Sequence, residues 1–160
     1  MDPTKLSFFK NLLLSGIIFL TIVSCKKDPE VTADHYDFVF GVYNFSWSTY
    51  VDLYAVRNGK VYPVNKNDYK GSDEFTFSDK PLSQDRYIIS HKLRNKFPEY
   101  LRNSTQNVFG CPGCGDQSTI YVELTENGKK RSWQLDEGNN GQKDVDEFAG
   151  EIKKTLELLK

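Results

Sequence analysis

Apolar and polar residues alternate with the period of a β-strand in three segments of the chain. The first segment spans residues 36–45, the second 49–64 and the third 120–136. Successive side chains of a strand point to opposite faces, so this alternation predicts strands with a buried face. The second and third segments are long enough for two strands each. Pro63 cannot donate a ladder hydrogen bond, which indicates an edge strand at the end of the second segment.

Each of the two longer segments is interrupted by an Asn-Gly pair, at Asn58-Gly59 and at Asn127-Gly128. A two-residue type I′ turn needs positive φ at both central residues, and Asn-Gly adopts it readily. We therefore predict two β-hairpins. Tyr-Val-Asp-Leu at 50–53 parallels Tyr-Val-Glu-Leu at 121–124. This parallel indicates either a duplicated ββα unit or two independent uses of common hairpin chemistry.

A helical period follows each predicted hairpin. Ile89, Leu93 and Phe97 recur every four residues, which predicts a helix that begins near Ser83 and loses its regular turn at Pro98. The second helix is predicted over about residues 144–159. Its apolar stripe consists of Val145, Phe148, Ile152, Leu156 and Leu159.

The predicted fold is therefore an α+β domain, with an antiparallel sheet of about five strands and two helices packed on one face. Tyr50, Tyr54 and Tyr121 alternate with the aliphatic positions, so we expect them on the opposite, helix-free face. Together with Trp47 they form a candidate binding face for a protein or a glycan, because exposed Tyr and Trp suit such contacts. Ordinary strand and core packing is the other interpretation of the same residues.

The N-terminus has a different pattern. Lys5 and Lys10 precede an apolar run over residues 12–23. The run is too short for a membrane-spanning helix, which needs about 20 residues, but it is typical of the apolar part of a signal peptide. It ends in the tetrapeptide Ile22-Val23-Ser24-Cys25.

This tetrapeptide resembles the lipobox of bacterial lipoproteins. The resemblance implies a signal peptide over residues 1–24, cleavage before Cys25, and acyl chains such as palmitate on that cysteine. Several acyl chains give stable membrane anchoring. Residues 25–34 would then be the lipidated end and a flexible tether, and residues 35–160 a single domain.

The residues after Cys25 refine the expected location. Lys26 stands where an Asp would signal inner-membrane retention, so the resemblance implies the outer membrane, on its periplasmic or its surface side. The charged tract 26–30 resembles that of lipoproteins of the Bacteroidota, where such a tract can direct surface export. A plain solvated tether is the alternative.

Composition narrows the function classes. The chain is close to neutral and has no basic stripe, so we expect no nucleic-acid partner. It contains no Ser-His-Asp constellation, phosphate-binding loop or paired-carboxylate motif, and we predict no catalytic residues, no cofactor and no enzyme activity.

With Cys25 assigned to the lipid, Cys111 and Cys114 remain, separated by Pro112-Gly113. Pro and Gly are the central residues of a type II turn, whose end Cα atoms lie within about 7 Å. A disulfide needs a Cα separation of about 4.4–6.8 Å. We therefore predict a disulfide-closed turn at the entry to the second hairpin.

Two other interpretations of this pair are weaker. A redox dithiol needs a thiolate stabilised at a helix N-terminus, whereas a strand is predicted downstream and Asp116 adds an anion. A zinc site needs four ligands, and neither His35 nor His91 has suitable spacing, so no metal is expected. Asp116 would instead accept N–H bonds from the glycine-rich loop.

The sequence thus predicts a non-enzymatic envelope lipoprotein, attached to the membrane by its lipid, that acts as a binding or inhibitor-type module. Its C-terminal hairpin and helix are faintly similar to emfourin-type proteinase inhibitors, but that similarity supplies no functional residues. A periplasmic thiol oxidoreductase using Cys111 and Cys114, or a structural lipoprotein without a specific ligand, are the alternatives.

Overall fold

The computed structural model describes residues 36–44, 50–66 and 75–160. The proposed signal peptide, the lipobox with Cys25, and Trp47 lie outside the described residues, so what was expected of them stays a prediction. Among the described residues, no helix is both long and apolar enough to cross a membrane.

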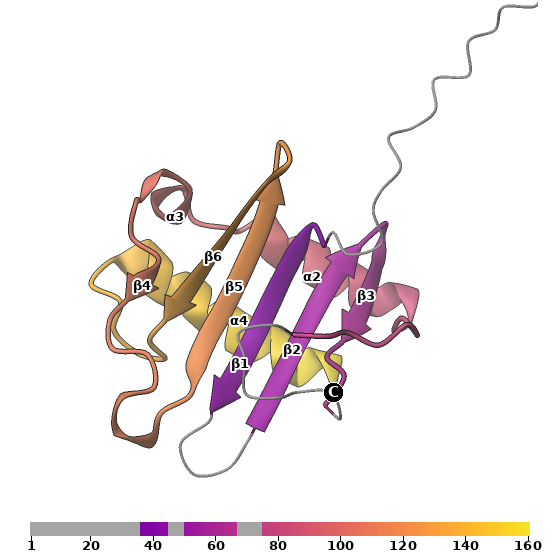
Figure 1. The fold of residues 1–160 in the computed structure, drawn as a ribbon, viewed down its shortest axis with the longest axis horizontal. Coiled ribbons are helices and arrows are strands. Elements are labelled where there is room, and N and C mark those ends of the chain that lie inside the picture. The colour runs from indigo at the N-terminus through magenta and orange to yellow at the C-terminus, as the bar shows by residue number, and fades with distance from the viewer. Residues whose placement is uncertain (1–35, 45–49, 67–74) are drawn as a thin grey trace, which may run out of the picture. The chain divides into compact units, whose positions relative to one another are not determined.

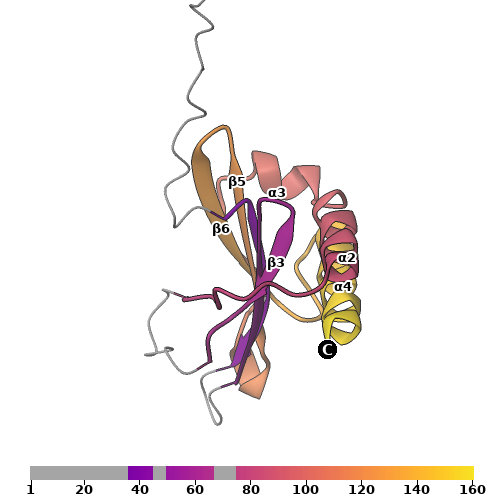
Figure 2. The same ribbon diagram turned by 90° about the vertical axis from the view of Figure 1, so that its right-hand side faces the viewer.

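A six-stranded sheet forms one layer, and helices cover one of its faces (Figures 1 and 2). The strand order is β3-β2-β1-β5-β6-β4. The strands are β1 (Phe38–Asn44), β2 (Tyr50–Arg57), β3 (Lys60–Pro63), β4 (Val108–Phe109), β5 (Thr119–Glu126) and β6 (Lys129–Leu135). The helices are α2 (Gln84–Arg94), α3 (Glu99–Asn103) and α4 (Lys143–Leu159).

The α+β class agrees with the prediction, but the details differ in two ways. The sheet is mixed and has six strands, because β4 pairs in parallel with β6 over only two residues. A strand this short has no alternation by which a sequence pattern could reveal it. The first predicted helix ends at Arg94, and the short α3 follows, with Pro98 at its N-cap.

The main core lies between the sheet and the helices. The apolar stripe predicted for α4 is buried in full. Helix α2 begins at Gln84, directly after Ser83, close to its predicted start. Both hairpins and β1 contribute to this core. Its largest fully buried side chains include Trp133, Phe38, Phe40, Leu101, Ile120 and Ile152.

A second apolar cluster occupies the helix-free face over β1 and β2. It consists of Tyr43, Val51, Leu53 and Val64, with Phe75, Phe77 and Tyr121 packed against it. We call the described part of the β3–α2 connection, residues 75–82, the strap. Because the strap contributes Phe75 and Phe77 to this cluster, part of the helix-free face is a second core.

Both hairpins have the predicted turns. Asn58 and Gly59 have φ of 51° and 70°, and Asn127 and Gly128 have φ of 53° and 73°. The order hairpin–helix, hairpin–helix is also found. However, Leu53 lies in the cluster on the helix-free face, whereas its sequence counterpart Leu124 lies in the helix-side core. Equivalent residues thus face opposite layers, which favours common hairpin chemistry over duplication.

Candidate functional site

The Cys-Pro-Gly-Cys segment forms the predicted turn. Gly113 has φ 75° and ψ 5°, the geometry of the third residue of a type II turn. The Cys114 N–H donates to the Cys111 carbonyl oxygen at 3.1 Å. The two Cα atoms are 5.5 Å apart, and the sulfur atoms are at disulfide distance. We call residues 110–118 the clip loop; both of its cysteines are exposed.

Asp136, at the end of β6, anchors the clip loop. Its Oδ2 accepts the Cys111 N–H at 3.2 Å, and its Oδ1 accepts the N–H groups of Gly138 at 2.7 Å and Asn139 at 3.0 Å. The bonds from Gly138 and Asn139, helped by that from Cys111, hold the pKa of the Asp136 carboxyl below its ordinary value. The carboxylate therefore joins two loops that are distant in sequence.

A buried asparagine extends this anchor to α4. The Asn140 side chain accepts the Asp136 N–H at 2.8 Å, and the Asn140 N–H donates to Asp146 Oδ1 at 2.6 Å. Gly110 fits against the same loop at φ 69°, where a Cβ would come within 2.3 Å of the Asn139 carbonyl oxygen. The clip loop is thus held by a specific network rather than by the cysteine pair alone.

Asp116 is not the buried residue that its predicted role assumed. Asp116 is exposed, at φ 69°, and its carbonyl oxygen accepts the Asn44 side-chain N–H at 2.9 Å. The Asp136 carboxylate accepts a main-chain N–H of the clip loop, a role that the sequence did not reveal. An Asp followed by Gly138 and Asn139 at a strand end is a signature of an Asx turn, and that signal could have identified it.

The surroundings of the cysteines do not favour thiolate chemistry. Cys114 begins a 3₁₀ turn of only three residues, Cys114–Asp116, which provides little of the dipole of a redox-active helix N-terminus. The Asp136 carboxylate lies against the Cys111 main chain, and a nearby anion disfavours a second negative charge. This arrangement is suited to holding a loop.

The three tyrosines expected on one face lie on two. Tyr54 belongs to the helix-side core, and Tyr50 shares its side of β2. The Tyr50 hydroxyl donates to Asp52 Oδ2 at 3.2 Å. Tyr121 lies on the helix-free face, where its hydroxyl donates to Glu123 Oε2 at 2.9 Å. The prediction that all three share the helix-free face is therefore wrong, since alternation alone does not say which face the helices cover.

Burial makes Tyr54 and Tyr121 harder to ionise than a free tyrosine. It raises the pKa of Tyr54 to about 12, with a further contribution from the charge of Asp52. Burial and the charge of Glu123 likewise raise the pKa of Tyr121. Their hydroxyls therefore act as hydrogen-bond donors, and they cannot serve as bases near neutral pH.

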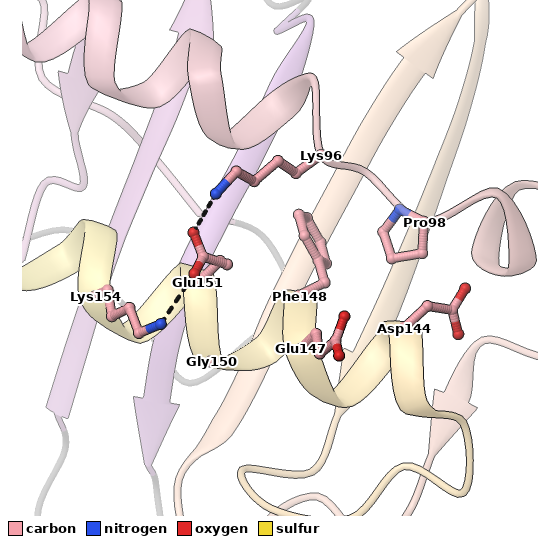
Figure 3. Close-up of a pocket in the computed structure, with 8 residues that line it drawn as sticks. All are labelled: Lys96, Pro98, Asp144, Glu147, Phe148, Gly150, Glu151 and Lys154. Atoms are coloured by element: carbon pink, nitrogen blue, oxygen red, sulfur yellow. Dashed lines mark hydrogen bonds and ion pairs between the residues drawn. The ribbon is translucent and has the colours of Figure 1, made fainter.

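A groove of about 530 Å³ lies between α4 and the segment that joins α2 to α3 (Figure 3). Phe148 and Pro98 supply its apolar lining. Glu151 accepts Lys96 at 2.5 Å and Lys154 at 3.0 Å, which lowers the pKa of its carboxyl. Asp144 and Glu147 line the other end, beside Pro98. Its two lysines are already paired with Glu151, so the groove offers a contact surface of mixed charge.

No group of three or more His, Cys, Asp or Glu side chains within the described ranges could hold a metal ion. His91 lies on α2 with its ring centroid 5.6 Å from that of Tyr87, and His35 is outside the described residues.

In comparisons with known proteins, no family model, no curated protein and no solved structure matches this chain significantly.

Proposed function

We propose that this chain is a lipid-anchored lipoprotein of the bacterial envelope that acts as a non-enzymatic binding or inhibitor-type module. The lipobox at residues 22–25 supports the anchor. The observation that carries the binding role is the position of the clip loop relative to the point where the chain enters the sheet.

The chain enters the sheet at Phe38, which pairs with Leu124 of β5, and β1 reaches Tyr43 opposite Thr119. Thr119 directly follows the clip loop, and the Asn44 side chain donates to that loop. A seven-residue strand spans roughly 20 Å. The clip loop and the entry point therefore lie at opposite ends of the sheet (Figure 1). A tether before Phe38 would therefore join the domain at the end of the sheet opposite the clip loop.

The clip loop is also organised before any partner arrives. The Cys111–Cys114 turn, the Asp136 carboxylate and the Asn44 side chain each fix one part of it. A loop that is already ordered loses less conformational entropy on binding, and surface loops on rigid scaffolds commonly carry binding function. This organisation supports a contact surface more than a redox site.

Intact mass spectrometry of the native protein tests the anchor. We expect a mature mass that begins at Cys25 and includes several acyl chains, and a Cys25→Ser variant that lacks them. A native protein with an unmodified Cys25 would overturn the anchor.

Cross-linking in intact cells, followed by capture of the tagged chain, tests the binding role. We expect a defined partner that a Cys111→Ala/Cys114→Ala variant loses and a Lys154→Ala variant, changed on the α4 groove, retains. Equal loss in both variants, or capture of no protein above background, counts against the clip loop as the contact surface.

Alkylation of the reduced protein across pH separates this proposal from thiol oxidoreductase function. A structural pair should have thiol pKa values at or above about 8.5. A thiol that is fully reactive near neutral pH would favour the oxidoreductase.

A further inference from the structure

The two edges of the sheet are protected to different degrees. At the β3 edge, the strap donates Ser78 N–H to the Pro63 carbonyl oxygen at 2.9 Å and Leu82 N–H to that of Val61 at 2.8 Å. Pro63 itself has no N–H. This edge is therefore closed by the chain's own backbone, as natural sheets commonly require.

The β6 edge is closed over only half its length. Gln134 N–H donates to the Asn107 carbonyl oxygen at 2.8 Å, and Asp136 N–H donates to that of Phe109 at 3.1 Å. Alternate residues of a strand direct their main-chain groups to the same side. Lys130 and Ser132 therefore direct theirs outward as well.

Within the described part of the chain, no turn or loop backbone bonds to Lys130 or Ser132 on that side. Figure 1 shows β4 beside the C-terminal end of β6, whereas no strand lies on the outer side of the end near the hairpin turn. We call residues 129–132 the open edge.

The side chains of the open edge favour a negatively charged occupant. Lys129 and Ser132 are exposed, and Lys130, which pairs with Glu123 at 3.3 Å, is 62% exposed. Arg131 is held away from the edge: its Nη1 donates to the Arg102 carbonyl oxygen at 2.6 Å, its Nη2 donates to Ser104, and its guanidinium lies 4.8 Å from the centroid of the Trp133 ring.

A second copy of the chain fits this edge poorly. Antiparallel pairing of two open edges would bring together two copies of Lys129 and Lys130. Like charges in adjacent strands are destabilising. An acidic extended segment has the complementary charge and meets no such repulsion.

The molecule already shows that β6 accepts a short added strand, because β4 pairs with Gln134 and Leu135 in parallel. Val108 of β4 is 49% exposed, which places an apolar side chain next to the open edge. We infer that the open edge of β6 binds an extended, acidic segment of a partner protein as an additional β-strand, in line with β4. This inference rests on the proposed binding function and adds a second contact surface to it. Arg131 pairs with Leu124, and Leu124 pairs with Phe38, so the open edge lies at the end of the sheet where the chain enters, away from the clip loop.

Fluorescence anisotropy with the full-length chain in detergent tests the inference. The probe is a labelled, capped eight-residue peptide of alternating Glu and Val, and the control peptide alternates Lys and Val. We expect saturable binding of the Glu/Val peptide that weakens as salt rises. Ser132→Pro should weaken it at least about tenfold, because it removes the outward N–H and leaves the ladder to β5 intact, whereas Ser132→Ala should change it less than about twofold.

A charge-reversal variant tests the inference without introducing a proline into β6. Lys129→Glu should weaken the Glu/Val peptide and strengthen the Lys/Val peptide. Lys60→Glu is the matched control, because Lys60 is also exposed and also follows an Asn-Gly turn, but it lies on the closed β3 side. Lys60→Glu should leave both affinities within about twofold.

Three results would overturn the inference: equal binding of both peptides, no saturable binding up to about 1 mM, or a dimer that Ser132→Pro abolishes. Such a dimer would mean that the open edge pairs with a second copy of the chain. An unmodified Cys25 would overturn the anchor without affecting the peptide results. A cross-linked partner that Ser132→Pro retains would overturn the edge inference and leave the binding function standing.

Discussion

The two hairpins, β2–β3 and β5–β6, share their turn chemistry and little else. Both turn on Asn-Gly with nearly equal φ values. Yet Tyr50 and Asp52 lie on the helix side of the sheet, whereas Tyr121 and Glu123 lie on the helix-free side. The local sequence thus specifies a hairpin and its tyrosine–carboxylate pair, but it does not specify the face on which that pair lies.

Their burial differs as well. All of β2 except its two end residues is buried. The helix-side core covers one face of the strand, and the second apolar cluster, with Phe75 and Phe77 of the strap, covers the other. In β6 only Trp133 and Leu135 are buried. The second hairpin contributes only Tyr121 of β5 to the second cluster, and β6 contributes nothing to it, so β6 retains an exposed face and an open edge.

β1 separates the hairpins, and Gly41 in its middle is the most sensitive test of that arrangement. Gly41 pairs with Leu53 on one side and Tyr121 on the other, at φ 152°, and a Cβ there would lie 2.1 Å from the Asp52 carbonyl oxygen. We expect Gly41→Ala to lower the free energy of unfolding by about 4 kcal/mol, from overpacking and backbone strain combined.

Urea denaturation measures this effect, and Gly150→Ala is the control. Gly150 lies in α4 with open space around its Cβ position, so the substitution should stabilise by about 0.5–1 kcal/mol. Equal effects of the two substitutions would contradict the close approach of β1 and β2.

Replacing leucine by alanine tests whether Leu53 and Leu124, which match in sequence, lie on opposite faces of the sheet. Leu53→Ala and Leu124→Ala should each cost about 3 kcal/mol, because both side chains are buried. In double-mutant cycles, Leu53→Ala should couple with Phe77→Ala of the strap, and Leu124→Ala with Ile152→Ala of α4, each by at least about 0.5 kcal/mol. Coupling of Leu53 with Ile152 would contradict the placement of Leu53 on the helix-free face.

The two Asn-Gly turns should lose similar amounts of stability when their glycine is replaced, because turn geometry is the feature that the two hairpins share. Gly59→Ala and Gly128→Ala each force a side chain into positive φ with no clash nearby, so each should cost about 1 kcal/mol. Thermal unfolding followed by circular dichroism compares them. A difference of more than about 1 kcal/mol would mean that the two turns are not equivalent.

Alkaline titration tests the buried tyrosine of the first hairpin. The pKa of Tyr54 is raised to about 12, above the ordinary value of 10.0, so the unfolded chain releases this proton first as pH rises. The contribution of Tyr54 to stability is therefore complete below pH 10 and is lost between about pH 10 and 12. Chemical denaturation across that range should show a shallower decline for Tyr54→Phe. An unchanged slope would contradict the buried environment of the hydroxyl.

Local patterns were enough to predict the hairpins, the α4 stripe, the start of α2 near Ser83 and the Cys-Pro-Gly-Cys turn, because each depends on residues close in sequence. They were not enough for β4, whose pairing with Gln134 and Leu135 is decided by tertiary contact. The face of Tyr54 depends on where the helices pack, and the anchoring of Cys111 by Asp136 joins positions distant in the chain. Asp116 is the nearer carboxylate in sequence, but it is exposed, and Asp136 is the carboxylate bonded to Cys111.

The pairing of β1 with β5 has a consequence for the order in which the chain can fold. Each hairpin closes a short loop, whereas Phe38 must meet Leu124 across most of the domain. Closing so long a loop is slow, and it cannot happen during synthesis until β5 has been made. Until then the β5-facing edge of β1, with Phe38 and Phe40, has no partner strand. A nascent chain in this state is open to aggregation, and a holding chaperone would have most effect at this stage.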